Sequence, residues 1–244
     1  MRVRVRYEKL GKIRFTSHRD TARHWERAVR KAGVAVSYSA GFTPRPRMSF
    51  GLALPTGAES VAEFLDIDLE SLPENATDAD ALCPLFDSTL PPGYSATRVA
   101  EIPSGTASLQ DAVVACTWHL DLVGVGTDDL AACTERVMSA SSVMLERERK
   151  GQRSVDDVRP AILSLEAAPP TGGDGTRAGL VATLATTSRG LRPLELVAAL
   201  LPALDPVDTT GRVLRTHQMI DVDGAIRELL PLDAVGARAR TERG

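Results

Sequence analysis

The chain of 244 residues is long enough for one large domain or for two domains of about 120 residues. Hydrophobic residues make up 43% and charged residues 25%, which is ordinary for a globular protein and excludes a fibrous or wholly disordered chain. No apolar run approaches the roughly 20 residues that cross a bilayer, and no apolar segment follows the arginine-rich start as in a signal peptide. We therefore expect a folded cytoplasmic protein.

The net charge of −3 conceals two neighbouring segments of opposite charge. Residues 1–50 hold 13 Lys and Arg against three acids, whereas residues 51–110 hold ten acids and one base. A local excess of one sign creates a field that attracts a partner of the other sign, here a polyanion. The alternative is that the acidic segment neutralises the basic one within the fold. We favour the ligand surface, and both interpretations stay open.

The cysteines give no sign of a metal centre or a disulfide framework. They are Cys83, Cys116 and Cys133, odd in number and separated by 33 and 17 residues. We expect buried thiols, no bound metal and no cofactor.

The first elements in chain order are a strand and a helix. From Arg2 to Tyr7, arginine alternates with apolar residues, which predicts a half-buried strand whose arginines face away from the core. Ser17 with Asp20 three residues later is typical of a helix start, and Gly33 is typical of a helix end, so residues 18–32 are predicted to be helical. The further elements predicted in this half are strands at 13–15, 34–38, 48–54, 61–69 and 94–102 and a helix at 77–86.

The same order recurs beyond a linker predicted at 103–110. The second half is predicted to hold strands at 112–123, 142–149, 154–166, 180–186 and 212–222, helices at 128–138 and 193–204, and a flexible turn at 172–175. We therefore predict an α+β protein with two tandem ferredoxin-like (βαββαβ) domains and antiparallel sheets. The predicted domains are 1–104 and 111–232, the second with an inserted hairpin, and a flexible tail follows at 233–244.

The basic residues of the first half gather in two places. Along the predicted helix, arginines recur three or four residues apart on a face distinct from its apolar one; they are Arg19, Arg23, Arg27 and Arg30. The segment Gly41–Gly51 reads GFTPRPRMSFG, and its two prolines hold Arg45 and Arg47 on a stiff loop that suits phosphate. Phe42 or Phe50 could stack on a base, although burial in the core is the favoured interpretation for both.

His18, at the start of the predicted helix, is a candidate catalytic residue. It could act as a general base on a ribose 2′-hydroxyl, an arrangement that resembles the CRISPR repeat-processing endoribonucleases. The favoured alternative is that His18 packs near the helix cap. Between the two lies a neutral imidazole that contacts RNA phosphate at the helix start.

A second basic cluster surrounds Gly151 in the other half of the chain. A solvated charged face and a phosphate-binding hairpin are equally weighted interpretations of this cluster. The candidate nucleic-acid-binding residues are therefore Arg14, His18, Arg19, Arg23, Arg45, Arg47, Lys150, Arg153 and Arg159.

Three segments of the first half resemble the signature of the radical SAM-linked protein family of bacteria, whose function is undefined. They are Ile13–Asp20, Glu26–Gly33 and Gly41–Gly51. The resemblance implies that the protein acts beside a B12-binding-type radical SAM enzyme, often near an RNase E/G-type ribonuclease. Members of that family often carry Asn where Thr43 lies and His where Arg45 lies. Radical SAM chemistry needs three closely spaced cysteines, which this chain lacks, so it would belong to the partner.

Our first hypothesis is an RNA-binding or substrate-presenting accessory module with no catalysis of its own, acting with a separate radical SAM enzyme. One alternative is a metal-independent endoribonuclease or RNA-modifying enzyme that uses His18. Another is a protein–protein adaptor for the radical SAM partner.

Overall fold

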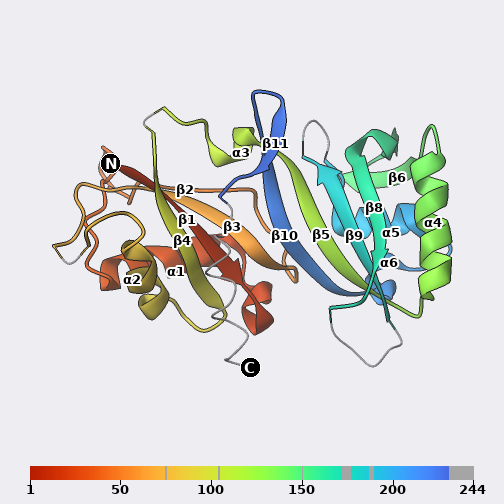
Figure 1. Ribbon diagram of the computed structural model, residues 1–244, viewed down its shortest axis with the longest axis horizontal. Helices are drawn as coiled ribbons and strands as arrows, with labels where there is room; N and C mark the ends of the chain where they lie inside the picture. Colours follow the sequence, from red (N-terminus) through yellow and green to blue (C-terminus); the bar gives the residue numbers. More distant parts are fainter. Residues whose placement is uncertain (75, 104, 150, 172–176, 187–189, 231–244) are drawn as a thin grey trace. The chain divides into compact units, whose positions relative to one another are not determined.

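The computed structural model describes residues 1–74, 76–103, 105–149, 151–171, 177–186 and 190–230 (Figure 1). It is an α+β chain with mostly antiparallel strands and few helices, as the sequence predicts. The chain divides into two compact units: unit 1 comprises Met1–Val113 with Ile220–Gly244, and unit 2 comprises Val114–Met219. The tail predicted at 233–244 and the turn predicted at 172–175 lie outside the described residues.

The sheet of unit 1 has β1 in an interior position. Its strands follow the order β4-β1-β3-β2, and each pair of neighbours is antiparallel. The strands are β1 (Arg2–Lys9), β2 (Met48–Phe50), β3 (Glu59–Asp68) and β4 (Tyr94–Ile102). Helices α1 (His18–Lys31) and α2 (Leu82–Thr89) lie beside one another next to this sheet (Figure 1). A short strand, β11 (Ala225–Glu228), also belongs to unit 1.

The core of unit 1 forms where the apolar stripe of α1 meets the sheet. Trp25 is fully buried, and its ring makes edge contacts with Tyr7 at 5.0 Å and with Phe86 at 5.9 Å between centroids. Such aromatic pairs add stability beyond the area that they bury. Val3 and Val5 of β1 contribute to the same cluster. The alternation of the first strand and the helical spacing of Trp25 and its neighbours therefore predicted this core correctly.

The sequence predicts that β1 is buried on one face only, but two arginines on its other face are buried as well. The exposed fraction is 5% for Arg4 and 3% for Arg6. The Arg4 guanidinium donates to both carboxylate oxygens of Asp66, at 2.7 and 2.9 Å, and Arg6 pairs with Glu228. The prediction was wrong for these two residues because acids from β3 and β11 cover the second face of the strand.

Three other elements of unit 1 differ from prediction. Residues 13–15 belong to a 3-10 turn, η1 (Gly11–Phe15), because too little chain separates Gly11 from the start of α1 for a strand to pair. Residues 34–38 make only isolated bridges, Val36 with Leu69 and Tyr38 with Pro46. Proline has no N–H to donate, so a continuous ladder cannot form there. The second helix begins at Leu82 rather than residue 77, after a turn in which Asp78 accepts from the Ala81 amide at 3.0 Å.

The main strands of unit 2 follow the order β10-β5-β9-β8. These strands are β5 (Val113–Val123), β8 (Ile162–Ala168), β9 (Arg177–Ala185) and β10 (Thr210–Val222). A separate hairpin joins β6 (Met144–Arg149) and β7 (Gln152–Asp157). The helices of unit 2 are α4 (Thr127–Ser139), α5 (Pro193–Leu200) and the one-turn α6 (Pro206–Thr209), whereas the one-turn helix α3 (Leu109–Ala112) belongs to unit 1.

The strand predicted at 154–166 is divided in two in the structure. A 3-10 turn, η2 (Arg159–Ala161), separates β7 from β8, because Pro160 interrupts the extended backbone. Only β8 joins the sheet of unit 2, while β7 pairs with β6.

No helix within the described ranges is long and apolar enough to span a bilayer. Among the described residues the cysteines form no disulfide; Cys116 is buried, and Cys83 and Cys133 are half-buried. Across the same ranges, no three His, Cys, Asp or Glu side chains gather in a way that could hold a metal ion.

Candidate functional site

The start of α1 is fixed by a side-chain cap. The Ser17 hydroxyl accepts from the Asp20 amide at 3.2 Å and donates to the Asp20 carboxylate at 2.7 Å. This hydrogen bond lowers the pKa of Asp20 below its ordinary value, and the Arg23 guanidinium at 3.0 Å lowers it further. The helix therefore begins where the Ser17 and Asp20 pattern predicted.

Replacing Ser17 with alanine is expected to destabilise the protein by about 1 kcal/mol, because the helix loses its cap. The Asp20 pKa should also rise toward its ordinary 3.8. A carboxyl whose pKa is lower in the folded state than in the unfolded state stabilises the fold at pH values above its unfolded-state pKa. This stabilisation is lost as the pH falls through the folded-state pKa. The alanine variant should therefore lose less stability than the wild type on acidification. Urea unfolding at several pH values measures both effects. Ser17→Asn, which keeps a capping acceptor, is the control, and equal stability of the alanine variant would contradict the cap.

One face of α1 carries four exposed arginines, and we call these residues the α1 arginine face. Thr21, Trp25, Ala28 and Val29 are the buried residues of the helix, and they lie on the other side. Arg23 pairs with Asp20, whereas the other three guanidinium groups form no ion pair with any residue that the structure describes. The α1 arginine face consists of Arg19, Arg23, Arg27 and Arg30.

The Gly41–Gly51 loop is clamped at its base. The Ser39 amide donates to the Arg45 carbonyl at 2.9 Å, and the Arg45 amide donates to the Ser39 hydroxyl at 3.0 Å. Below this pair, the Arg47 amide donates to the Ser37 carbonyl at 2.8 Å. Residues 40–44 therefore form a tip on a hydrogen-bonded stem, which we call the clamped loop (residues 37–47).

The clamped loop exposes an aromatic ring and two arginines. Phe42 is fully exposed at its tip, so the favoured interpretation of this residue as core was wrong, while Phe50 is half-buried as a core role requires. The Arg45 side chain forms no ion pair with a described residue. Arg47 lies 4.0 Å from Asp68 at an exposed site, where water screens the pair strongly.

His18 lies at the first position of α1 and is exposed. Its ring meets the ring of Phe50 edge-on, with centroids 5.4 Å apart, which brings the helix start beside β2. In the described part of the chain no carboxylate or hydroxyl hydrogen-bonds with this ring. A general base is normally oriented by such a partner.

Phe15 of η1 is an exposed aromatic residue that no sequence pattern singles out. The Arg14 guanidinium lies 4.6 Å from the centre of the Phe15 ring, and Phe15 is mostly exposed. Arg14 also lies 3.7 Å from Glu59. Residues 13–15 had been expected to form a strand, which hid the fact that the turn carries Phe15 outward.

The basic cluster of unit 2 is largely satisfied within its own unit. Arg153 lies 3.6 Å from both Glu146 and Glu148. Arg159 donates to the carbonyls of Met138 and Ile162, at 3.0 and 2.8 Å, so its guanidinium ties η2 to the end of α4. The third candidate of this cluster, Lys150, lies outside the described residues. These contacts favour the interpretation of the cluster as a structural and solvated face.

Comparison with known proteins gives a family but no activity. A chain of the solved structure titled "Crystal Structure of a Cbf5-Nop10-Gar1 Complex" is 8% identical, with a TM-score of 0.48, over 88% of this chain and 48% of that one. The chain thus spans about half the length of that structure's chain. Comparison with curated proteins finds none that matches. Residues 2–193 match the family model described as "Uncharacterized protein conserved in bacteria (DUF2344)". The chain therefore belongs to this uncharacterised bacterial family.

Proposed function

We propose that the protein is an RNA-binding accessory module that holds RNA on unit 1 and has no catalysis of its own. The observation that carries this proposal is the α1 arginine face, where three of four guanidinium groups have no ion pair with a described residue. Unpaired cations in a row attract a phosphate backbone, and the release of its counterions drives binding.

Exposed aromatic rings elsewhere on unit 1 favour RNA with unpaired bases. Phe42 at the tip of the clamped loop and Phe15 beside Arg14 both offer a ring to solvent. Stacking of a base on an aromatic side chain contributes roughly 1–3 kcal/mol and requires a base that is free of its duplex. We infer that loops or single-stranded segments are the preferred ligand.

We also propose that each unit is a ferredoxin-like βαββαβ fold. The strand orders β4-β1-β3-β2 and β10-β5-β9-β8 support this assignment, with the β6–β7 hairpin as an insertion in unit 2. Such a sheet would leave the crossover helix α1 on its surface, where the arginine face can meet a ligand.

The proposed partner rests on the resemblance of the Ile13–Gly51 segments to the radical SAM-linked family. In this proposal the module presents RNA to a separate B12-binding-type radical SAM enzyme, in a setting that includes an RNase E/G-type ribonuclease. Co-purification of the enzyme with this chain that survives removal of the RNA by nuclease would instead favour a protein adaptor.

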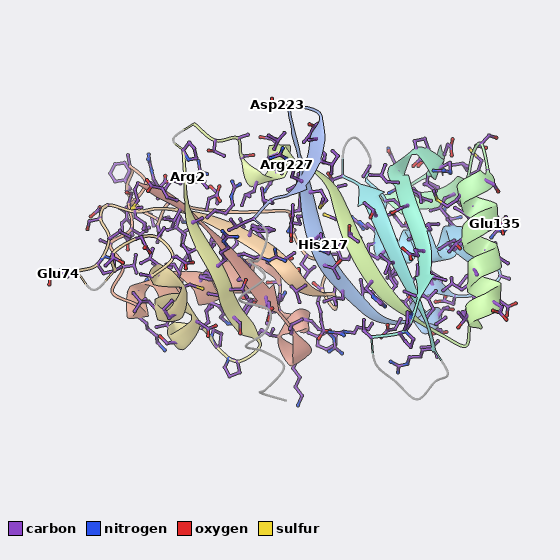
Figure 2. The ribbon with its side chains drawn as sticks, in the orientation of Figure 1. Arg2, Glu74, Glu135, His217, Asp223 and Arg227 are labelled. Atoms are coloured by element: carbon purple, nitrogen blue, oxygen red, sulfur yellow. The ribbon has the colours of Figure 1, made fainter. Side chains whose placement is uncertain are left out.

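The clamped loop offers the first test of RNA binding. The double variant Arg45→Ala/Arg47→Ala is expected to bind a single-stranded RNA about tenfold more weakly at low salt, because two phosphate contacts are lost. Fluorescence anisotropy at two salt concentrations measures the affinity. Arg227→Ala, which removes an exposed cation from β11 (Figure 2), is the control and should bind as wild type does. Absence of binding by the wild type at low salt would refute the proposal.

A further inference from the structure

A groove of about 310 Å³ lies in unit 1 between the C-terminal half of α1 and the end of α2. His24, Arg27 and Lys31 line it from α1, and residues 88–91 line it from α2 and the turn that follows. None of these lining residues is acidic. The groove therefore gathers three basic side chains, spaced three and four residues apart along one flank of the helix, in a concave site.

The cations of this groove are not neutralised within the protein. Arg27 and Lys31 are exposed and form no ion pair with a described residue. Asp20, one turn before His24, already holds Ser17 and Arg23. The end of the α1 dipole accounts for a cation at Lys31, but Arg27 and His24 lie before the last turn of the helix. The two cations Arg27 and Lys31, with the His24 imidazole beside them, match an anion that carries more than one negative charge.

His24 is held in a fixed orientation at the groove. Its ring meets the ring of Tyr94 edge-on at 5.6 Å, and the Tyr94 hydroxyl in turn hydrogen-bonds with Thr21 at 2.8 Å. The Nδ1 atom of His24 is buried and has no hydrogen-bond partner among the described residues. The ring nitrogen that can reach a ligand in the groove is therefore Nε2.

We propose that this groove binds the terminal phosphate monoester of an RNA strand, an inference that rests on the proposed function. Arg27 belongs both to the groove and to the α1 arginine face. The end of an RNA strand that lies along the arginine face can therefore enter the groove. A terminal monoester carries up to two negative charges and an internal diester only one, which makes the monoester the better match. Arg27 supplies a bidentate donor, Lys31 a point charge and His24 an Nε2 donor.

Oligonucleotides that differ only in their ends test the groove. One single-stranded RNA is prepared with a 5′-phosphate, with a 3′-phosphate and with hydroxyl ends, and the affinity of each is measured at low salt. In the wild type one of the terminal phosphates should tighten binding about tenfold, the size expected of charge-assisted hydrogen bonds. Lys31→Gln and His24→Gln should abolish this gain while they keep most of the affinity for the hydroxyl form. Lys12→Gln, which removes an exposed lysine outside the groove, should retain the gain.

Inorganic phosphate gives a second measurement that does not depend on RNA. Its titration should shift the imidazole NMR signals of His24 saturably in the wild type and leave them unmoved in Lys31→Gln. Oligonucleotides that bind equally whatever their ends, with His24 unmoved by phosphate, would overturn the groove and leave the proposed function standing. A shift of His24 without any RNA binding would overturn the RNA terminus as ligand, together with the proposed function.

Discussion

Asp66→Ala is expected to lower the free energy of unfolding by about 3–5 kcal/mol, because it leaves a buried arginine without its counter-charge. Asp66 is 1% exposed and faces Arg4 directly across the β1–β3 pair. It accepts two hydrogen bonds from Arg4 and a third from Arg2 at 3.2 Å. Urea unfolding followed by circular dichroism measures the change.

Two further variants separate the buried charge from a general loss of acid. Asp68→Ala, two residues further along β3 at a partly exposed position, should cost no more than about 1 kcal/mol, since its pairs with Arg2 and Arg47 are screened by water. The double variant Arg4→Met/Asp66→Leu should recover most of the stability that Asp66→Ala loses, because it removes both charges together. An equal loss of unfolding free energy in Asp66→Ala and Asp68→Ala would show that the buried Arg4–Asp66 pair contributes no more to stability than the exposed pairs.

Replacement of the whole α1 arginine face by glutamine is expected to weaken RNA binding more than about tenfold at low salt and to flatten its salt dependence. Each phosphate contact on a single strand contributes about 0.7 to the slope of log affinity against log salt, so four lost contacts reduce the slope by up to about 3. Glutamine keeps nearly the helix propensity of arginine, so α1 should remain folded. Affinity at four salt concentrations, with circular dichroism as the check on folding, measures both effects.

The control for this variant is Arg227→Gln, which removes an exposed cation from β11. It should leave the slope unchanged within error. If the arginine-face variant kept the wild-type salt dependence of RNA affinity, the RNA would have to bind elsewhere on the protein. The arginines of α1 would then serve only to keep that face of the helix in contact with water.

The elements that the sequence predicts well are those fixed by neighbours in the chain. Helix α1 begins at its Ser17 cap and buries Trp25 as its apolar spacing requires. The burial of the β1 arginines depends instead on residues that are distant in the sequence. Arg4 meets Asp66 only because β3 pairs in that register, and Arg6 meets Glu228 from the far end of the chain. No local pattern holds this information.

The intramolecular interpretation of the charge asymmetry holds for the buried Arg4 of β1, whereas the ligand surface stays a proposal for the exposed arginines. Asp66 of the acidic segment pairs with Arg4, as the intramolecular interpretation requires, whereas the partner of Arg6 is Glu228 from outside that segment. Arg19, Arg27 and Arg30 of α1 and Arg45 of the clamped loop form no ion pair with a described residue, whereas Arg23 pairs with Asp20. Repeated spacing made both groups look alike in the sequence, and only the sheet register separates them.

The candidate site was predictable in part. The arginines of α1 and of the clamped loop were found from their spacing, whereas the exposure of Phe42 depends on a stem that Ser39 and Arg45 close through hydrogen bonds. The groove had a sequence signal, His24, Arg27 and Lys31 at helical spacing. That signal has meaning only once the end of α2 lies beside α1.

The stem of the clamped loop has a consequence for how recognition can diversify. Its closing hydrogen bonds use main-chain groups of Ser37, Ser39, Arg45 and Arg47, and the one side chain involved is the Ser39 hydroxyl. Residues 40–44 contribute nothing to that closure. Their identity can therefore change without breaking these hydrogen bonds, and under the proposed function an exchange of these five residues would alter the ligand preference of the loop. For the same reason, the tip is a suitable place to graft a foreign recognition sequence onto this protein.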